Sequence, residues 1–243
     1  RLGQIPAKRH TQFRKPDGQL FTEEVMGMEG FSGIQSLLYH YHPPTRIRKA
    51  EKLADLQPDF VEFGALRARQ LRTHNWARGG DALESRTVMM GNEDVLLGMS
   101  CPDKDMEYYY RNGQAYEVWF LHKGECLFRS QFGNLEVGPG DYLVIPYGTT
   151  WQLQLRTPTA RFFTIECPSQ VQPPKRYRNQ HGQLLEHSPF CERDIRIPQE
   201  LESHSEEGEF EVRVKARNEL HRHILAQHPL GVVGWDGYLY PWI

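Results

Sequence analysis

The sequence predicts a mainly β protein, built around an antiparallel β-barrel or sandwich, with additional N-terminal strands and one short C-terminal helix. Six short strand-like runs separated by glycine-rich turns crowd into residues 116–165. The chain also contains 21 glycines and 16 prolines, which favours a turn-rich fold over a helical bundle. Its 243 residues, 39% of them hydrophobic, are enough to bury a core.

The N-terminal part predicts short strands joined by ordered loops. Residues 1–48 place turn signals such as Pro16-Asp17-Gly18 between short apolar runs. Residues 49–75 carry more charge and mixed periodicity, and this pattern leaves their secondary structure open.

The central part predicts the strands of the barrel, whose core covers about residues 87–167. Residues 87–98 (TVMMGNEDVLLG) indicate two strands around a Gly-Asn turn. The remaining strands are expected at 116–121, 126–131, 134–137, 142–145, 151–155 and 161–165.

The C-terminal part predicts three different elements. Residues 168–200 are rich in proline and polar side chains, which indicates a long structured excursion over the surface. Residues 209–215 alternate charged and apolar side chains, as a half-buried strand does. Residues 219–227 are expected to form the short helix, closed by the His228-Pro229 pair.

Composition excludes several classes of partner. The chain has 29 Lys and Arg against 31 Asp and Glu, without a basic cluster, so neither a nucleic acid nor an acidic membrane is expected. No run approaches the roughly 20 apolar residues of a membrane span, and the N-terminus lacks a signal-peptide core. A cytoplasmic protein trimmed at both ends is the expectation. No C-x-x-C pair occurs, so reduced thiols are expected at Cys101, Cys126, Cys167 and Cys191.

The most specific local pattern is the segment 140–151 (GDYLVIPYGTTW), which resembles the second motif of the cupin fold, G-x5-P-x-G-x2-H. Gly140, Pro146 and Gly148 supply the bends that this motif needs at the rim of a barrel. Trp151 stands where a metal-binding cupin has histidine. The resemblance implies a cupin-like antiparallel β-barrel or jelly roll with an altered metal site.

The first cupin motif, H-x-H-x4-E-x6-G, is matched from residue 110 only at its Glu and Gly positions. Tyr110 and Asn112 replace the two histidines, and Glu117 alone remains of the expected ligands. A phenol and an amide bind Fe(II) or Zn(II) weakly, so we expect a filled, metal-free barrel with a structural role. His122 falls on the strand face opposite Glu117 and is expected outside the barrel interior.

Segments outside the barrel resemble the N-terminal half of homogentisate 1,2-dioxygenases. The C-terminal segment 232–241 (VVGWDGYLYP) is similar to the family's V-V-x-W-H-G-N-Y-x-P pattern. The N-terminal matches are 6–14 (PAKRHTQFR), 18–24 (GQLFTEE), 27–33 (GMEGFSG) and 36–44 (SLLYHYHPP). The resemblance thus extends from Pro6 to Pro241.

The resemblance implies an Fe(II) enzyme that inserts O2 into homogentisate and opens its ring to maleylacetoacetate, in tyrosine and phenylalanine breakdown. Two His and one Glu of a C-terminal cupin would hold the iron and leave positions open for substrate and O2. These ligands are expected after Ile243. Residues 1–231 would form the metal-free N-terminal domain, and residues 232–243 would begin the catalytic cupin. A homo-oligomer, a trimer or a hexamer, is expected.

Asp236 is the candidate catalytic residue that the resemblance provides. It aligns with the family's histidine that faces the substrate and handles its phenolic proton. A carboxylate can also accept a proton or a hydrogen bond, although the change leaves open whether homogentisate or a related hydroxylated phenylacetate is the substrate. The alternative is a polar residue in a turn after Trp235.

Two groups of histidines are candidate metal ligands. His40 and His42 could share one strand face, and His221 and His228 one face of the expected helix, which also contains His223. No acidic residue lies at ligand spacing between His221 and His228, and surface or packing roles are expected for all five.

Two other function classes remain open. A non-catalytic, metal-free cupin could bind a small molecule or act as a scaffold; a ligand beside Glu117 would favour this class, and a solidly packed interior would count against it. A bicupin isomerase or storage protein has only analogy of fold in its support.

Overall fold

The protein is described here by a computed structural model that places residues 2–5, 12–61, 65, 67–76 and 79–243. Residues 6–11 of the N-terminal match therefore lie outside the described residues. Among the described residues, no helix is long and apolar enough to cross a membrane.

A three-stranded sheet contains the N-terminal strands. A hairpin of β1 (Thr22–Glu29) and β2 (Ser32–His40) pairs on its β2 side with β15 (Val232–Gly237) near the end of the chain, and all neighbours are antiparallel. The expected N-terminal strands are thus confirmed, and the segment around Asp236 is part of the same sheet.

Two larger sheets form the jelly roll that the cupin motifs predict. The five-stranded sheet has the order β10-β7-β12-β5-β4, and the seven-stranded sheet has the order β3-β14-β13-β6-β11-β8-β9. Their strands are β3 (Ile47–Asp55), β4 (Thr87–Gly91), β5 (Leu96–Ser100), β6 (Tyr109–Asn112), β7 (Tyr116–Lys123), β8 (Cys126–Ser130), β9 (Gly133–Val137), β10 (Tyr142–Ile145), β11 (Thr150–Leu155), β12 (Arg161–Cys167), β13 (Glu207–Ala216) and β14 (Glu219–Gln227). The predicted barrel strands and the strand at 209–215 are confirmed.

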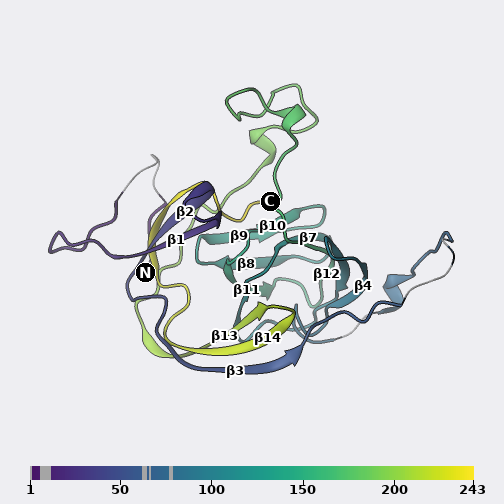
Figure 1. The fold of residues 1–243 in the computed structure, drawn as a ribbon, viewed down its shortest axis with the longest axis horizontal. Coiled ribbons are helices and arrows are strands. Elements are labelled where there is room, and N and C mark those ends of the chain that lie inside the picture. Colours follow the sequence, from purple (N-terminus) through teal and green to yellow (C-terminus); the bar gives the residue numbers. More distant parts are fainter. Residues whose placement is uncertain (1, 6–11, 62–64, 66, 77–78) are drawn as a thin grey trace.

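The expected C-terminal helix at 219–227 is wrong, because these residues form β14. Arg217 and Asn218 both adopt positive φ, 53° and 56°, and join β13 to β14 in a two-residue hairpin turn. β14 then pairs with β13 on one side and with β3 on the other (Figure 1). Hydrogen bonding along both edges overrides the weak helical pattern of this segment.

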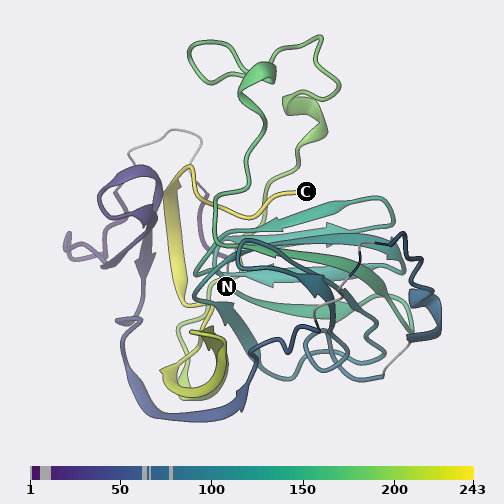
Figure 2. The ribbon, with the colours of Figure 1, turned by 45° about the vertical axis from the view of Figure 1, so that its right-hand side comes forward.

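Residues 168–200 form the predicted excursion. They contain only two short 3-10 helices, η2 (Lys175–Tyr177) and η3 (Glu192–Asp194), and stand away from the sheets in both ribbon views (Figures 1 and 2). The C-terminus returns to the base of this excursion, where the backbones of Arg196 and Ile243 exchange two hydrogen bonds of 2.7 and 3.0 Å.

The core between the two large sheets is rich in aromatic side chains. Trp119, Trp151, Phe128 and Phe162 are among its fully buried side chains. A second core, around Leu38 and Trp235, lies beneath the three-stranded sheet. None of the four cysteines is in a disulfide, and only Cys167 is partly exposed, which confirms the expected free thiols.

Candidate functional site

The barrel positions that would hold a metal in other cupins are filled by aromatic rings. Tyr110 on β6 and Trp151 on β11 are each 1% exposed, and their ring centroids lie 5.3 Å apart, edge to face. Trp119 contacts Trp151 in the same geometry at 5.5 Å. These side chains bury large apolar areas where imidazoles would otherwise converge.

Glu117, the one side chain of the cupin motifs that could still bind a metal, forms an ion pair with Arg86. It is fully buried on β7, and its Oε1 accepts a 2.6 Å hydrogen bond from Nη1 of Arg86. Nη2 of Arg86 donates at 2.9 Å to Glu166, which also accepts a 2.6 Å bond from Nζ of Lys215. Two cations and two carboxylates therefore neutralise one another between the sheets.

The charges of this cluster support one another. Burial alone would lower the pKa of Arg86, but Glu117 and Glu166 outweigh burial and hold the pKa above its usual value. Burial alone would raise the pKa of Glu166, yet Arg86 and Lys215 lower it. Arg86 and Glu166 are thus both charged at neutral pH.

This donor set does not fit iron. Oδ1 of Asn112 accepts hydrogen bonds of 3.1 Å from the backbone N–H groups of Gln114 and Ala115, so it supports a turn. The guanidinium of Arg86 carries positive charge beside Glu117, where a metal ion would be repelled. No group of three or more His, Cys, Asp or Glu in the described part of the chain is arranged to hold a metal. His122 is exposed, as its place opposite Glu117 predicts.

Asp236 lies on a different surface, the outer face of the three-stranded sheet. It pairs with Leu37 of β2 inside β15, so it is a strand residue and the turn interpretation is wrong. Its neighbour Trp235 points the opposite way and donates from Nε1 to the backbone carbonyl of Phe132 at 2.8 Å. Strand alternation therefore places Asp236 away from the core.

A cavity of about 460 Å³ opens beside Asp236. Leu37 and Val25 give it apolar walls, and Gln35, Tyr39 and Tyr238 add polar groups. Burial, helped by the charges of Glu23 and Asp236, raises the pKa of Tyr39, so its phenol stays protonated. The volume is in the usual range of small-molecule sites, and a carboxylate beside phenols can orient and deprotonate a hydroxylated ring.

The structure gives the first histidine group separate partners. β2 ends at His40, whose Nε2 lies 2.8 Å from Glu24. His42 lies beyond the strand, and its Nε2 is 3.0 Å from the backbone carbonyl of Ser205. The two rings therefore do not share one strand face, and each contacts a different partner.

The second histidine group is divided by the replacement of the expected helix with β14. His221 and His223 lie within this strand, where His221 contacts Glu219 at 3.0 Å. His228 follows the strand and stacks on His204, with ring centroids 3.9 Å apart. The expected shared helical face of His221 and His228 is wrong, and each of these two rings has polar or packing contacts of its own.

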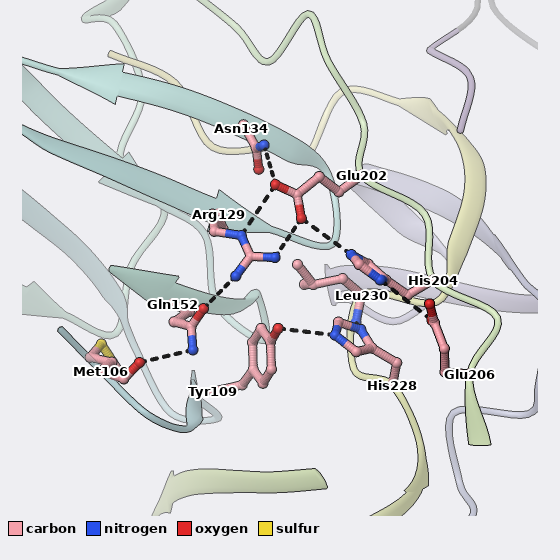
Figure 3. A network of polar contacts seen from close by, with 10 residues as sticks. All are labelled: Met106, Tyr109, Arg129, Asn134, Gln152, Glu202, His204, Glu206, His228 and Leu230. Atoms are coloured by element: carbon pink, nitrogen blue, oxygen red, sulfur yellow. Dashed lines mark hydrogen bonds and ion pairs between the residues drawn. The ribbon is translucent and has the colours of Figure 1, made fainter. Parts of the chain in front are cut away.

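A polar network that the sequence did not suggest connects the seven-stranded sheet to the C-terminal segments (Figure 3). Arg129 on β8 donates to both carboxylate oxygens of Glu202, and its Nη1 donates to Gln152 at 2.7 Å. Glu202 also accepts from Asn134 at 2.7 Å and contacts His204 at 3.2 Å. Burial would raise the pKa of Glu202, but the bonds from Arg129, Asn134 and His204 lower it to about 2.

His228 ends this network in its neutral form. Its Nδ1 accepts a 3.1 Å hydrogen bond from the backbone N–H of Leu230, so the proton is assigned to Nε2, which lies 3.2 Å from the hydroxyl of Tyr109 (Figure 3). Burial and the neighbouring His204 lower the pKa of His228 to about 4. The arrangement suits a structural clamp between segments.

Comparison with known proteins places the chain among relatives. A family model described as homogentisate 1,2-dioxygenase N-terminal matches residues 70–243. A protein of Saccharolobus solfataricus, whose name marks it provisionally as a dioxygenase, is 41% identical over 242 residues. This match covers 99% of the chain and 62% of that protein, so the chain spans less than two thirds of this relative's length.

Solved structures with some likeness include two bacterial proteins. A cupin-2 domain protein of Shewanella frigidimarina is 17% identical, with a TM-score of 0.31, over 34% of this chain and 79% of that one. A double-stranded β-helix protein of Klebsiella pneumoniae is 15% identical, with a TM-score of 0.36, over 44% of this chain and 95% of that one. The jelly-roll assignment itself comes from the strand order of this chain.

Proposed function

This chain belongs to the homogentisate 1,2-dioxygenase family, and from that premise we propose that it is the metal-free N-terminal half of an enzyme that cleaves the ring of homogentisate with O2. The family match over residues 70–243 is the observation that carries the proposal. The provisional name of the Saccharolobus relative, similar along nearly the whole chain, supports dioxygenase chemistry.

In this proposal the barrel is a scaffold, and the iron ligands lie in a segment after Ile243. Arg86 and Glu117 support that division, since the ion pair removes the one carboxylate that a metal could have used. When bound elsewhere, Fe(II) would supply the activation of O2 and a coordination site for the phenolate. The residues described here would position the substrate and the catalytic segment.

Asp236 is proposed to face the substrate and to accept its phenolic proton. Its place in a cavity with Tyr39 and Tyr238 supports this role, because phenols and a carboxylate suit a hydroxylated aromatic ring. Homogentisate is the proposed substrate. A related hydroxylated phenylacetate is the alternative substrate, because Asp236 stands where the family has histidine.

Oxygen uptake by the full natural protein, loaded with Fe(II), tests the activity. With homogentisate, one mole of O2 should be consumed for each mole of ring-opened product. With 4-hydroxyphenylacetate, no oxygen uptake is expected. If only another dihydroxyphenylacetate drove oxygen uptake, the proposed ring cleavage would stand but the substrate would not be homogentisate. Absence of uptake with every hydroxylated phenylacetate, in protein that holds iron, would reject the proposal.

Asp236→Asn tests the assigned residue. Loss of a general base should lower kcat by about 100-fold while the fold and the iron content stay unchanged. Asp94→Asn is the matched control, because Asp94 is an exposed carboxylate in the β4–β5 turn. Equal activity of both variants would remove Asp236 from the reaction.

A non-catalytic cupin is the second candidate. Its strongest form places a ligand beside Glu117, and the aromatic packing of Trp119 and Trp151 counts against that position.

A further inference from the structure

A second cavity, of about 200 Å³, opens between the two large sheets where β4 and β5 face β13 and β14. It shares no lining residue with the cavity beside Asp236. Leu83, Val88, Leu96 and Leu220 form apolar walls. Binding of a compact apolar group in this cavity would therefore be favourable, because the group would leave water for apolar walls.

The inner end of this cavity is polar and deeply buried. Tyr110 is 1% exposed, Glu166 is 3% exposed and Lys215 is 6% exposed, and all three line the cavity. Arg86 lines it beside them. These side chains come from both sheets and are fixed by strand pairing and ion pairs, so the polar end is preorganised.

The unused hydrogen-bonding capacity at this end is mostly that of donors. Lys215 uses one of its three N–H groups, and Arg86 uses two of its five. The Tyr110 hydroxyl lies at the same end, and burial raises its pKa, so it stays protonated and can donate. Both oxygens of Glu166, in contrast, already accept from Arg86 and Lys215.

The charged lining is balanced by ion pairs, so the free N–H donors of Lys215 and Arg86 are what a carboxylate would bind. Arg86, Lys215 and Arg213 line the cavity as cations, against the carboxylates of Glu84 and Glu166. Glu117 lies behind Arg86 and does not line the cavity. Arg213 is held with its guanidinium carbon 3.5 Å from the ring centroid of Tyr108 and also pairs with Glu211 at 2.7 Å.

We propose that this cavity binds a small monocarboxylic acid, with the carboxylate on Tyr110, Lys215 and Arg86 and the apolar body against the leucines. The volume is below that of drug-sized sites, so the ligand has about ten non-hydrogen atoms, as benzoate does. This site is independent of the proposed ring cleavage, because it uses neither Asp236 nor iron.

Fluorine NMR titration of the full natural protein with 4-fluorobenzoate tests the proposal. Saturable binding is expected, with a dissociation constant of about 0.1–10 mM for a ligand of this size. The neutral 4-fluorobenzyl alcohol should bind at least about 10-fold more weakly, since it lacks the charge that Lys215 and Arg86 select. Absence of saturation, or equal binding of the alcohol, would overturn the proposal.

Two variants place the ligand in this cavity. Tyr110→Phe keeps the ring and should weaken 4-fluorobenzoate binding by about 10-fold, while Tyr142→Phe, an exposed tyrosine on β10, should leave it unchanged. Val88→Trp adds bulk at a wall residue that is 42% exposed, so it should block the cavity without entering the core. Full binding by either folded cavity variant would show that the acid binds elsewhere and reject the site.

The outcome is separable from that of the proposed function. Loss of 4-fluorobenzoate binding in Val88→Trp with unchanged homogentisate-dependent oxygen uptake is the expected combination. Active protein without acid binding would reject only the site, and inactive protein with acid binding would reject only the dioxygenase.

Discussion

The guanidinium of Arg86 lies 2.6 Å from Glu117, the one side chain of a metal-ligand type that remains at the barrel's motif positions. The altered motif positions, Tyr110, Asn112 and Trp151, could be identified from the sequence and predicted a metal-free barrel. Arg86 could not, because its partners are 31 and 80 positions away and no local pattern connects them. The cavity beside Asp236 likewise depends on the pairing of strands from opposite ends of the chain.

Replacing Arg86 tests whether this ion cluster stabilises the barrel. Arg86→Met should lower the free energy of unfolding by about 3–5 kcal/mol, because it leaves Glu117 buried without its cation and Glu166 with Lys215 alone. Arg156→Met is the control: Arg156 forms an exposed pair with Glu136, and its loss should cost about 1 kcal/mol or less. Urea denaturation measures both, and equal losses would contradict the stabilising role of the cluster.

At the scale of elements, local patterns predicted strands well where turns carried glycine. The motif glycines show the reason: Gly124 and Gly148 have φ of +92° and +78°, a region that other residues avoid. The hairpin turn at Arg217-Asn218 contains no glycine, so the boundary between β13 and β14 has no such signal, and the sequence of β14 alone predicts a helix. Long-range pairing with β3 decided its structure.

Glycine substitution tests the turn argument. Gly124→Ala should cost roughly 2–4 kcal/mol of unfolding free energy, because the added Cβ would lie 2.5 Å from the carbonyl oxygen of Thr159 in addition to the strained φ. Gly140→Ala has a similar φ of +97° but open space around its Cβ, so about 1–2 kcal/mol is expected. If thermal or urea unfolding gave Gly140→Ala the larger loss, the steric part of the argument would fail.

At the scale of the whole molecule, the network of Figure 3 ties the seven-stranded sheet to the segment around residue 204 and to the chain after β14. Such a junction has no sequence signal, because its members are spread from Met106 to Leu230. The division into domains at residue 231 and the oligomeric state stay predictions.

This junction predicts how stability depends on pH. The folded pKa of His228, about 4, lies below its ordinary value of 6.5, so the unfolded chain binds the proton first and stability falls as pH decreases from 6.5 to 4. Glu202 adds a further loss from pH 4.5 toward 2. The His228 part should amount to about 1–2 kcal/mol, reduced by partial solvation of the ring.

Urea midpoints between pH 7 and pH 4 measure this effect. His228→Gln should flatten the decrease, while His181→Gln, at an exposed ring of the excursion, should leave it as in the unchanged protein. An equally steep decrease in His228→Gln would assign the acid sensitivity to other groups.

Anomalous X-ray diffraction at the iron edge, from crystals of the full natural protein, tests the central claim most directly. The account predicts an iron peak outside residues 1–243 and none between the two large sheets. A peak at coordination distance, about 2.2 Å, from Glu117, Tyr110 or Asn112 would contradict it.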